Sequence, residues 1–239
     1  ANGPVRLNDG LHWDVLHLWS DIKDGIRKSS SQVDHKLGSL GLDTWAIDFA
    51  LLEKNKSLLS NPFHYRDART DGMMDEAFKR LPRAEIFSNT GIQFMQINTL
   101  YQLLAMSVQK SPLFDVAKTF VTIPDLFNFW LSGELTNEFT NATTTQCFDP
   151  RKRDWSSAIL NSFNIPTHLF QSTTDSGTRI GTLLPSLVEE INVEAIPVVV
   201  PACHDTGSAV VSVPAAEKDF AWISSGTWSI MGVESEQPI

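Results

Sequence analysis

The stretch VVVPACHDTGSAVVSV, residues 198–213, decides the fold. Its apolar first part has the composition of a buried strand, and the small residues after Asp205 suit the first turn of a helix. In sheets that alternate with helices, ligands bind in the crevice outside the carboxyl ends of the strands. His204 and Asp205 occupy such a strand end. The stretch therefore predicts a strand, a ligand-facing carboxylate and a helix in succession.

Local sequence leaves two interpretations of Asp205 open. The carboxylate either takes part in chemistry at the strand end or caps the helix by accepting the N–H groups two or three residues on. His204 by itself is more typical of a buried, hydrogen-bonded histidine than of a catalytic one. Neighbouring residues do not separate these alternatives.

Composition describes a globular protein with a small-molecule partner. The chain has 239 residues, 42% of them hydrophobic, and a formal net charge of −9, which disfavours nucleic acid and membrane surfaces as partners. No apolar run approaches the roughly 20 residues that cross a bilayer, and the N-terminus lacks a signal pattern. Cys147 and Cys203 lie outside any metal-binding spacing and are typical of free thiols in a reducing compartment. We expect a cytoplasmic protein.

Helical and strand patterns alternate along the chain, which predicts the α/β class. Helices are expected at 13–29, with Trp13, Leu16, Trp19 and Ile26 on one face, and at 75–81, 98–109, 124–132 and 155–165. The Thr-rich residues 138–149 are expected as strand or loop. Residues 40–53, LGLDTWAIDFALLE, are expected as two strands about a polar turn at Asp43 and Thr44, and 219–234 as a hairpin.

Three polar segments are candidates for ligand contacts, each with a structural alternative. The turn SSGTWS, 224–229, presents backbone N–H groups and hydroxyls that suit phosphate oxygens, or is an ordinary hairpin turn. Gln93, Gln96 and Asn98 carry amides of the kind that recognise sugar hydroxyls, or cap the following helix. The loop HYRDARTDG, 64–72, forms a polar wall for a hydroxylated ligand, or is a solvated loop of paired charges.

Seven segments together resemble one known family. They are GLDTWAIDFALLE, YRDARTDGMM, TGIQFMQINTLYQLLA, IPDLFNFWLSGE, EFTNATTTQ, HDTGSAV and ISSGTWSIMGVE. Their order and rough spacing are similar to those of the rhamnulokinases of the FGGY carbohydrate kinase family, over about residues 2–234. This resemblance implies an actin-like or ribonuclease-H-like kinase that transfers the γ-phosphoryl group of ATP to the 1-hydroxyl of L-rhamnulose in rhamnose catabolism.

The resemblance also implies roles for particular residues. Asp205 matches the catalytic base, and His204 and Thr206 match positions that line the sugar. The loop Asp43, Thr44, Trp45 and Ala46 matches a sugar-binding loop whose last residue is usually glycine, so Ala46 leaves the exact sugar open. Gln93 and Asn98 are further sugar candidates. Ser225, Gly226 and Thr227 match the nucleotide-binding turn, and Mg²⁺ is expected with ATP through ligands that the sequence does not identify.

By the same resemblance, residues 1–213 form the N-terminal, sugar-binding domain without its first strands. Residues 214–239 begin the C-terminal, ATP-binding domain. The family's DxGxSSGR-like phosphate loop and most of that second domain have no counterpart here, so we expect the chain alone to be inactive or nearly so. A sheet that lacks its inner strands leaves an unpaired edge, which favours self-association.

Two other functions stay open. One is a kinase for another ketose, such as fuculose or xylulose. The other is a sugar-binding module without catalysis.

Overall fold

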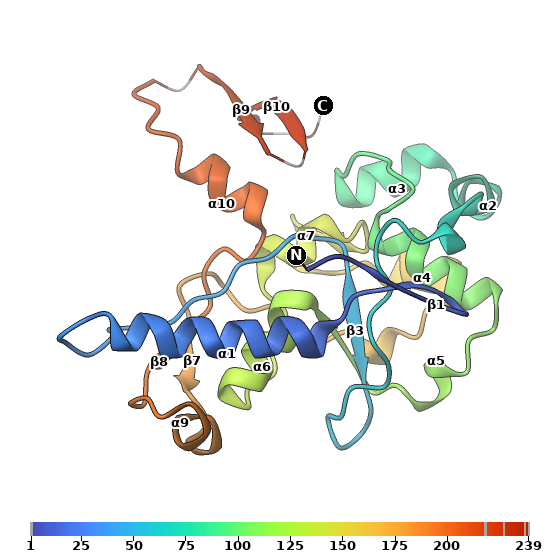
Figure 1. The fold of residues 1–239 in the computed structure, drawn as a ribbon. Helices are drawn as coiled ribbons and strands as arrows, with labels where there is room; N and C mark the ends of the chain where they lie inside the picture. The colour runs from blue at the N-terminus through green and yellow to red at the C-terminus, as the bar shows by residue number, and fades with distance from the viewer. Residues whose placement is uncertain (1, 218, 227, 237, 239) are drawn as a thin grey trace.

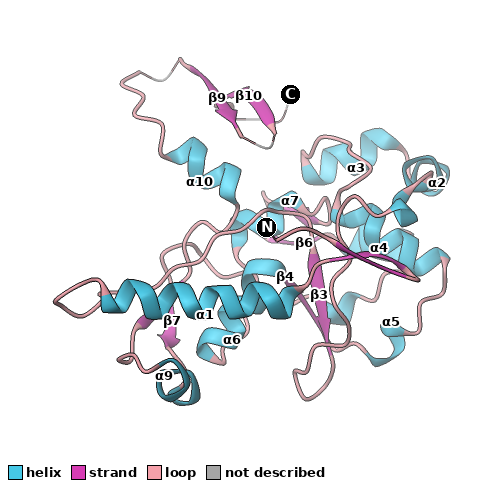
Figure 2. Cartoon of the chain, viewed as in Figure 1, coloured by secondary structure: helices cyan, strands magenta, loops and turns pink. Residues whose placement is uncertain are grey.

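The computed structural model describes residues 2–217, 219–226, 228–236 and 238. Helices and strands alternate over most of this chain (Figure 1 and Figure 2), so the expected α/β class is confirmed. Within the described residues, no helix is long and apolar enough to span a membrane.

The α-helices are α1 (Val15–Ser31), α2 (Met73–Arg80), α3 (Arg83–Thr90), α4 (Thr99–Val108), α5 (Leu113–Val116), α6 (Ile123–Ser132), α7 (Phe139–Thr144), α8 (Ser157–Ser162), α9 (Pro185–Ile191) and α10 (Asp205–Val211). The 3-10 helices are η1 (Ala68–Thr70) and η2 (Thr167–Leu169). The strands are β1 (Val5–Leu7), β2 (Gly10–His12), β3 (Phe49–Leu52), β4 (Thr119–Thr122), β5 (Phe148–Asp149), β6 (Asp154–Trp155), β7 (Arg179–Thr182), β8 (Pro197–Val199), β9 (Ala221–Ser225) and β10 (Ser229–Val233).

The strands pair two by two in antiparallel sheets: β1 with β2, β3 with β4, β5 with β6, β7 with β8, and β9 with β10. Isolated parallel bridges add to these pairs, and two of them join the same two segments. Leu40 pairs with Val198, and Thr44 pairs with His204. The chain before β3 therefore runs alongside the chain that leads from β8 to α10.

The β3–β4 sheet is buried on both faces, as expected of an α/β core. Successive side chains of a strand point to opposite faces. Phe49 and Leu51 accordingly pack in a cluster with apolar residues of α4, whereas Ala50 and Leu52 pack with residues of α1 and α6. This sheet and its covering helices form the frame from which the candidate site projects.

Most of the expected helices are present. The helices expected at 75–81, 98–109, 124–132 and 155–165 correspond to α2, α4, α6 and α8, and the hairpin at 219–234 is formed by β9 and β10. Helix α1 matches its expected range, but the prediction that Leu16 lies on its buried face is wrong. Leu16 is exposed, whereas Val15 and Ile26 are buried.

Two secondary-structure predictions are wrong. The Thr-rich segment contains helix α7, because the carboxylate of Glu138 accepts the Asn141 N–H and caps the first turn. Residues 40–53 contain one strand, β3, preceded by bridges at Leu40 and Thr44 instead of a first hairpin strand. The partner of residues 40–44 is the distant segment 198–204, which local patterning does not reveal.

The β9–β10 hairpin lies apart from the main body and is joined to it through α10 (Figure 1). The proposed domain boundary after residue 213 falls in this connection and stays a prediction.

Candidate functional site

Strand β8 ends at Val199, earlier than the predicted end at His204, and residues 200–204, here termed the strand end, lead to Asp205, the first residue of α10. Val198 and Val200 are buried, as expected of the apolar run. The Asp205 side chain is 53% exposed. Its Oδ1 accepts the N–H of the adjacent Thr206 at 2.7 Å, and within the described residues no N–H group two or three residues on donates to it. The N-cap residue is His204, which makes no side-chain cap bond. Most of the Asp205 carboxylate is therefore available to a ligand.

His204 lies beside this carboxylate. The distance from its Nε2 to Asp205 Oδ1 is 3.7 Å, and its side chain is 25% exposed. Burial lowers the pKa of His204, although the charges of Asp205 and Glu138 act in the opposite direction. At neutral pH the ring is uncharged and offers one donor and one acceptor nitrogen.

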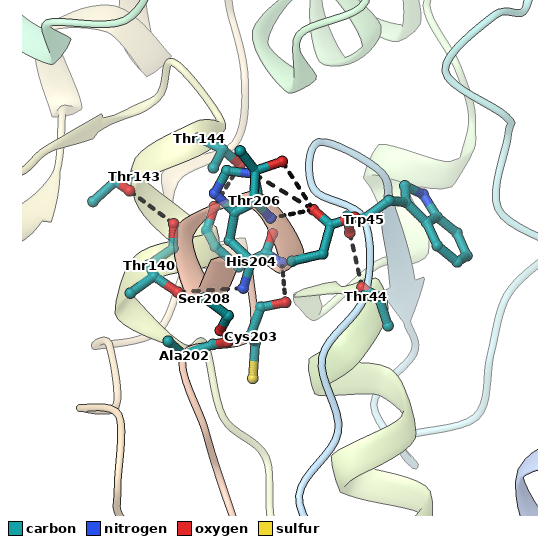
Figure 3. Close-up of polar contacts among 12 residues, drawn as sticks. Thr44, Trp45, Thr140, Thr143, Thr144, Ala202, Cys203, His204, Thr206 and Ser208 are labelled. Carbon is teal, nitrogen blue, oxygen red and sulfur yellow. Dashed lines mark hydrogen bonds and ion pairs between the residues drawn. The ribbon is translucent and has the colours of Figure 1, made fainter. Parts of the chain in front are cut away.

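The loop that contains Thr44 is bonded to the same strand end. The Thr44 N–H donates to the Cys203 carbonyl oxygen at 3.0 Å, and the Asp205 N–H donates to the Thr44 carbonyl oxygen at 3.0 Å. Figure 3 shows Thr44 and Trp45 next to His204 and Thr206. The structure thus brings residues 43–46 and 204–206 together, although about 160 residues separate them in sequence.

Within this loop the residues differ in exposure. Asp43 is exposed, and Thr44, Trp45 and Ala46 are half-buried. The Trp45 ring packs on Trp13, with ring centroids 4.2 Å apart, and its Nε1 donates to a buried carboxylate, that of Asp48, at 3.0 Å. The Trp45 indole is therefore already packed and hydrogen-bonded within the protein. The parts of the loop that can contact a ligand are its backbone and the Asp43 side chain.

Asp48 is a buried residue that holds the loop 43–46 through its hydrogen bond with Trp45. It was not identified from the sequence. The Asp48 carboxylate also accepts from Trp13 Nε1 at 2.6 Å and from Gln102 Nε2 at 2.9 Å. Burial raises the pKa of Asp48 to about 6, against the opposing effect of these hydrogen bonds. The available signal was a carboxylate within an apolar run, IDFALL.

A strained turn precedes Asp48. Its N–H donates to the Ala46 carbonyl oxygen at 2.9 Å, which closes a γ-turn about Ile47. Ile47 has φ +70°, a value that is costly for a β-branched side chain. The Ile47 carbonyl oxygen accepts from Thr99 Oγ1 at 2.6 Å and from Gln102 Nε2 at 3.3 Å. These two residues of α4 therefore hold the turn that carries Ala46.

The amide candidates before α4 have different environments. The Gln93 side chain is exposed. Asn98 is buried, and its Nδ2 donates to the Gln93 carbonyl oxygen at 2.9 Å and to Gln146 Oε1 at 3.0 Å. Both N–H donors of the Asn98 amide are thus used within the protein. Asn98 therefore stabilises the chain that leads into α4, and its amide nitrogen has no donor left for a sugar. Gln96 donates to Asp71 at 2.6 Å.

The charged loop 64–72 combines features of both of its predicted interpretations. Arg69 is half-buried, donates to Gln102 Oε1 at 2.7 Å and lies over the Phe63 ring, 3.9 Å from its centroid. Burial lowers its pKa to about 10. Arg66 is exposed and lies 6.0 Å from the centroid of the Trp228 ring in the hairpin. The loop thus places Arg66 beside the predicted nucleotide turn.

In that turn, Ser225 and Gly226 are exposed, and Thr227 lies outside the described residues. The Gly226 N–H donates to the Trp228 carbonyl oxygen at 2.9 Å, and the Ser225 and Ser229 hydroxyl oxygens are 3.4 Å apart. A cavity of about 670 Å³ between the hairpin and the body is lined by Gly91, Ile92, Thr143, Met231 and their neighbours. None of the predicted site residues that the structure describes lines it.

The donor set around Asp205 fits a magnesium ion that arrives with a nucleotide. Magnesium is usually held by one or two carboxylates together with substrate phosphates and water, and Asp205 and Asp43 are exposed carboxylates in this region. In the described part of the chain, no three His, Cys, Asp or Glu side chains are grouped to hold a metal by themselves.

Comparison with known proteins gives a consistent result. Residues 7–212 match the N-terminal domain of the FGGY family of carbohydrate kinases. The rhamnulokinase of Oceanobacillus iheyensis is 42% identical over 238 residues, which are 100% of this chain and 50% of that protein. The chain spans about half the length of the curated relatives it matches.

Solved structures share the fold. A ligand-bound xylulose kinase from Lactobacillus acidophilus aligns with a TM-score of 0.90 at 17% identity, over 100% of this chain and 49% of that one. A Plasmodium falciparum glycerol kinase with ADP aligns with a TM-score of 0.79 at 16% identity, over 96% and 47% of the two chains.

Proposed function

This chain belongs to the FGGY family of carbohydrate kinases, and from that membership we propose that the protein carrying it phosphorylates L-rhamnulose. The γ-phosphoryl group of ATP would pass to the 1-hydroxyl of the sugar, giving L-rhamnulose 1-phosphate and ADP. The observation that carries the proposal is the half-exposed carboxylate of Asp205, held beside the Thr44 loop. The identity to the O. iheyensis rhamnulokinase supports the choice of sugar.

In this proposal Asp205 is the general base. Phosphoryl transfer depends on alignment and charge stabilisation more than on covalent chemistry by the protein. The sugar hydroxyl oxygen attacks the γ-phosphorus, the bond between that phosphorus and the bridging oxygen breaks with ADP leaving, and the hydroxyl proton passes to the Asp205 carboxylate. Asp205 suits this step because its carboxylate is 53% exposed and accepts one short hydrogen bond within the described chain, from the Thr206 N–H.

The remaining residues bind the substrates. We propose that neutral His204 and Thr206 contact sugar hydroxyls, together with the backbone of the loop from Asp43 to Ala46. Gln93, being exposed, is a further candidate. Ser225, Gly226 and Thr227 would contact the nucleotide. Magnesium, when bound with ATP, would offset phosphate charge, and Asp205 or Asp43 would supply its protein ligand.

Two further proposals concern the chain by itself. It spans about half the length of the relatives it matches, so we propose that it turns over sugar slowly or not at all alone. We also propose self-association through the open strand edges of its small sheets. A coupled ADP assay tests the first proposal, and size-exclusion chromatography tests the second. Kinase-like turnover of roughly 1 to 100 per second, or a stable monomer on dilution, would contradict them. A cytoplasmic location stays a prediction.

The substrate is tested with the whole protein, ATP and a panel of ketoses. We expect the highest kcat/KM for L-rhamnulose, with lower values for fuculose and xylulose. A preference for another ketose would support the proposed kinase activity but contradict the proposed sugar. The Ala46→Gly variant would then show whether the methyl group of Ala46 sets that preference. Sugar binding without ADP production by any ketose would instead favour a noncatalytic binding module.

A further inference from the structure

A buried carboxylate, that of Glu138, lies behind the strand end that carries Asp205. Glu138 is fully buried and precedes α7. Its Oε2 accepts from the Cys203 N–H at 3.1 Å, the Asn141 N–H at 3.0 Å and the Thr140 hydroxyl at 2.6 Å. Its Oε1 accepts from the Ser176 hydroxyl at 2.7 Å. A carboxylate in an interior is stabilised by such a set of donors, and in return it fixes the groups that donate.

Two of these bonds reach the residues next to Asp205. The Cys203 N–H bonds Glu138 directly, and the His204 N–H donates to Thr140 Oγ1 at 3.3 Å, whose hydroxyl donates onward to Glu138. Figure 3 shows Thr140 and Ser208 on the side of His204 and Cys203 away from Thr44. Both backbone N–H groups that precede Asp205 are therefore tied, directly or through one hydroxyl, to the same carboxylate.

The Thr44 loop is tied to the same point. The Cys203 carbonyl oxygen accepts the Thr44 N–H at 3.0 Å and the Asn141 amide at 3.4 Å. Cys203 is thus bonded to Glu138 through its N–H and to the Thr44 loop through its carbonyl group. A shift of Glu138 would move the strand end and the loop together.

We propose that Glu138 is the positioning residue for the catalytic base. It acts through the backbone of Cys203 and His204 and through the Thr140 hydroxyl, and it sets where the Asp205 carboxylate stands relative to the Thr44 loop. The inference rests on the proposed kinase function. Rates of transfer reactions fall steeply when reacting groups are displaced by about 1 Å, so the role is expected to appear in kcat.

The test compares four variants of the whole protein. Glu138→Gln replaces the carboxylate whose Oε2 accepts the Cys203 N–H, the Asn141 N–H and the Thr140 hydroxyl. Thr140→Val, which keeps the side-chain shape, removes the link to the His204 N–H. Ser176→Ala removes only the bond at Oε1. Asp125→Asn is the matched control for a buried carboxylate, because Asp125 accepts from the Thr122 and Thr136 hydroxyls and the Glu138 N–H, and none of these donors belongs to residues 203–205.

We expect Glu138→Gln to lower kcat about tenfold and Thr140→Val to lower it several-fold, with KM for the sugar and for ATP within about twofold of wild type. The scale follows from the modest net contribution of a hydrogen bond to a charged group. Ser176→Ala and Asp125→Asn should keep kcat within about twofold, measured well below each variant's melting temperature. Loss of kcat in Asp125→Asn equal to that in Glu138→Gln, or no loss in Glu138→Gln, would overturn the proposal.

A second measurement separates this inference from the function on which it rests. Amide hydrogen exchange of Cys203 and His204 is expected to quicken in Glu138→Gln and Thr140→Val but not in Ser176→Ala. If the whole protein phosphorylates no ketose while this pattern holds, the kinase function fails and the support of the strand end by Glu138 stands. If the protein is active and exchange at both amides is unchanged, the positioning role fails alone.

Discussion

The backbone N–H of Asp205 donates to the carbonyl oxygen of Thr44 at 3.0 Å. This bond joins the end of one parallel segment to a loop more than 150 residues earlier in the chain. It places the candidate base and the candidate sugar loop at one edge of the core, with Glu138 and Asp48 buried behind them.

The γ-turn at Ile47 is expected to depend on Thr99. Removing the Thr99 hydroxyl in Thr99→Val frees the Ile47 carbonyl oxygen from its 2.6 Å bond, and the turn can then relax from its positive φ. We expect sugar affinity to fall roughly three- to tenfold, on the order of one hydrogen bond. Isothermal titration of sugar into the whole protein measures this affinity. Thr90→Val is the control, because the partners of the Thr90 hydroxyl within the described residues are the Ile86 carbonyl group and the Ile92 N–H.

Glycine at position 47 should weaken this dependence. Gly adopts positive φ at little cost, so the Thr99→Val change is expected to cost less sugar affinity when combined with Ile47→Gly than in the wild-type background. Equal losses in both backgrounds would mean that the Thr99 bond does not restrain a strained turn.

The free energy of unfolding is expected to carry a contribution from two buried carboxyls. Burial raises the pKa of Asp48 and of Asp125 to about 6, above their ordinary value of 3.8. Their protonated forms are favoured in the folded protein, so this contribution is fully present below about pH 4 and is lost as the pH rises through about 6. Burial lowers the pKa of His204, so the folded protein favours the uncharged ring. The contribution of His204 to the free energy of unfolding is therefore present above about pH 6.5 and is lost as the pH falls below that value.

A variant isolates the carboxyl contribution. Between pH 5 and pH 8, wild type should lose more unfolding free energy than Asp48→Asn, since an amide does not titrate. Chemical denaturation at both pH values gives the comparison. The same loss in the two proteins would show that Asp48 does not titrate in this range.

Two leucines test the burial pattern. Leu104 in α4 is fully buried, whereas Leu16 in α1 is 62% exposed. Leu104→Ala is expected to lower the unfolding free energy by about 2 to 5 kcal/mol, the usual cost of such a cavity, and Leu16→Ala by about 0.5 kcal/mol or less. Denaturant unfolding checks both, and a comparable loss in the two variants would contradict the placement of α1.

Much of the fold could be predicted from local sequence, because helices such as α1 and α4 have an apolar face that repeats every three to four residues. Helix α7 could not, since its threonines disfavour a helix and its start depends on the Glu138 cap. The site divides in the same way. The change from an apolar run to polar residues within 198–213 pointed to Asp205, but its hydrogen bond with Thr44 joins segments about 160 residues apart and was not predicted.

The buried supports were missed for a physical reason. Asp48 meets Gln102, 54 residues away, and Glu138 meets Cys203, 65 residues away. Carboxylates are rarely buried without partners, and partners at such separations leave no local pattern. For Asp48 the sequence offers one sign, a lone acid inside the apolar run IDFALL, whereas Glu138 lies in a polar, Thr-rich stretch where an acid is not unusual.

The central claim is that Asp205 takes the proton from the sugar hydroxyl, and one paired measurement tests it. In the whole protein, kcat for L-rhamnulose and the Kd for the sugar are compared between wild type and Asp205→Asn. We predict that kcat falls about 100-fold or more, the usual scale for a general base, while Kd changes by less than about threefold. An Asp205→Asn protein that keeps a kcat within a few-fold of wild type would contradict the account.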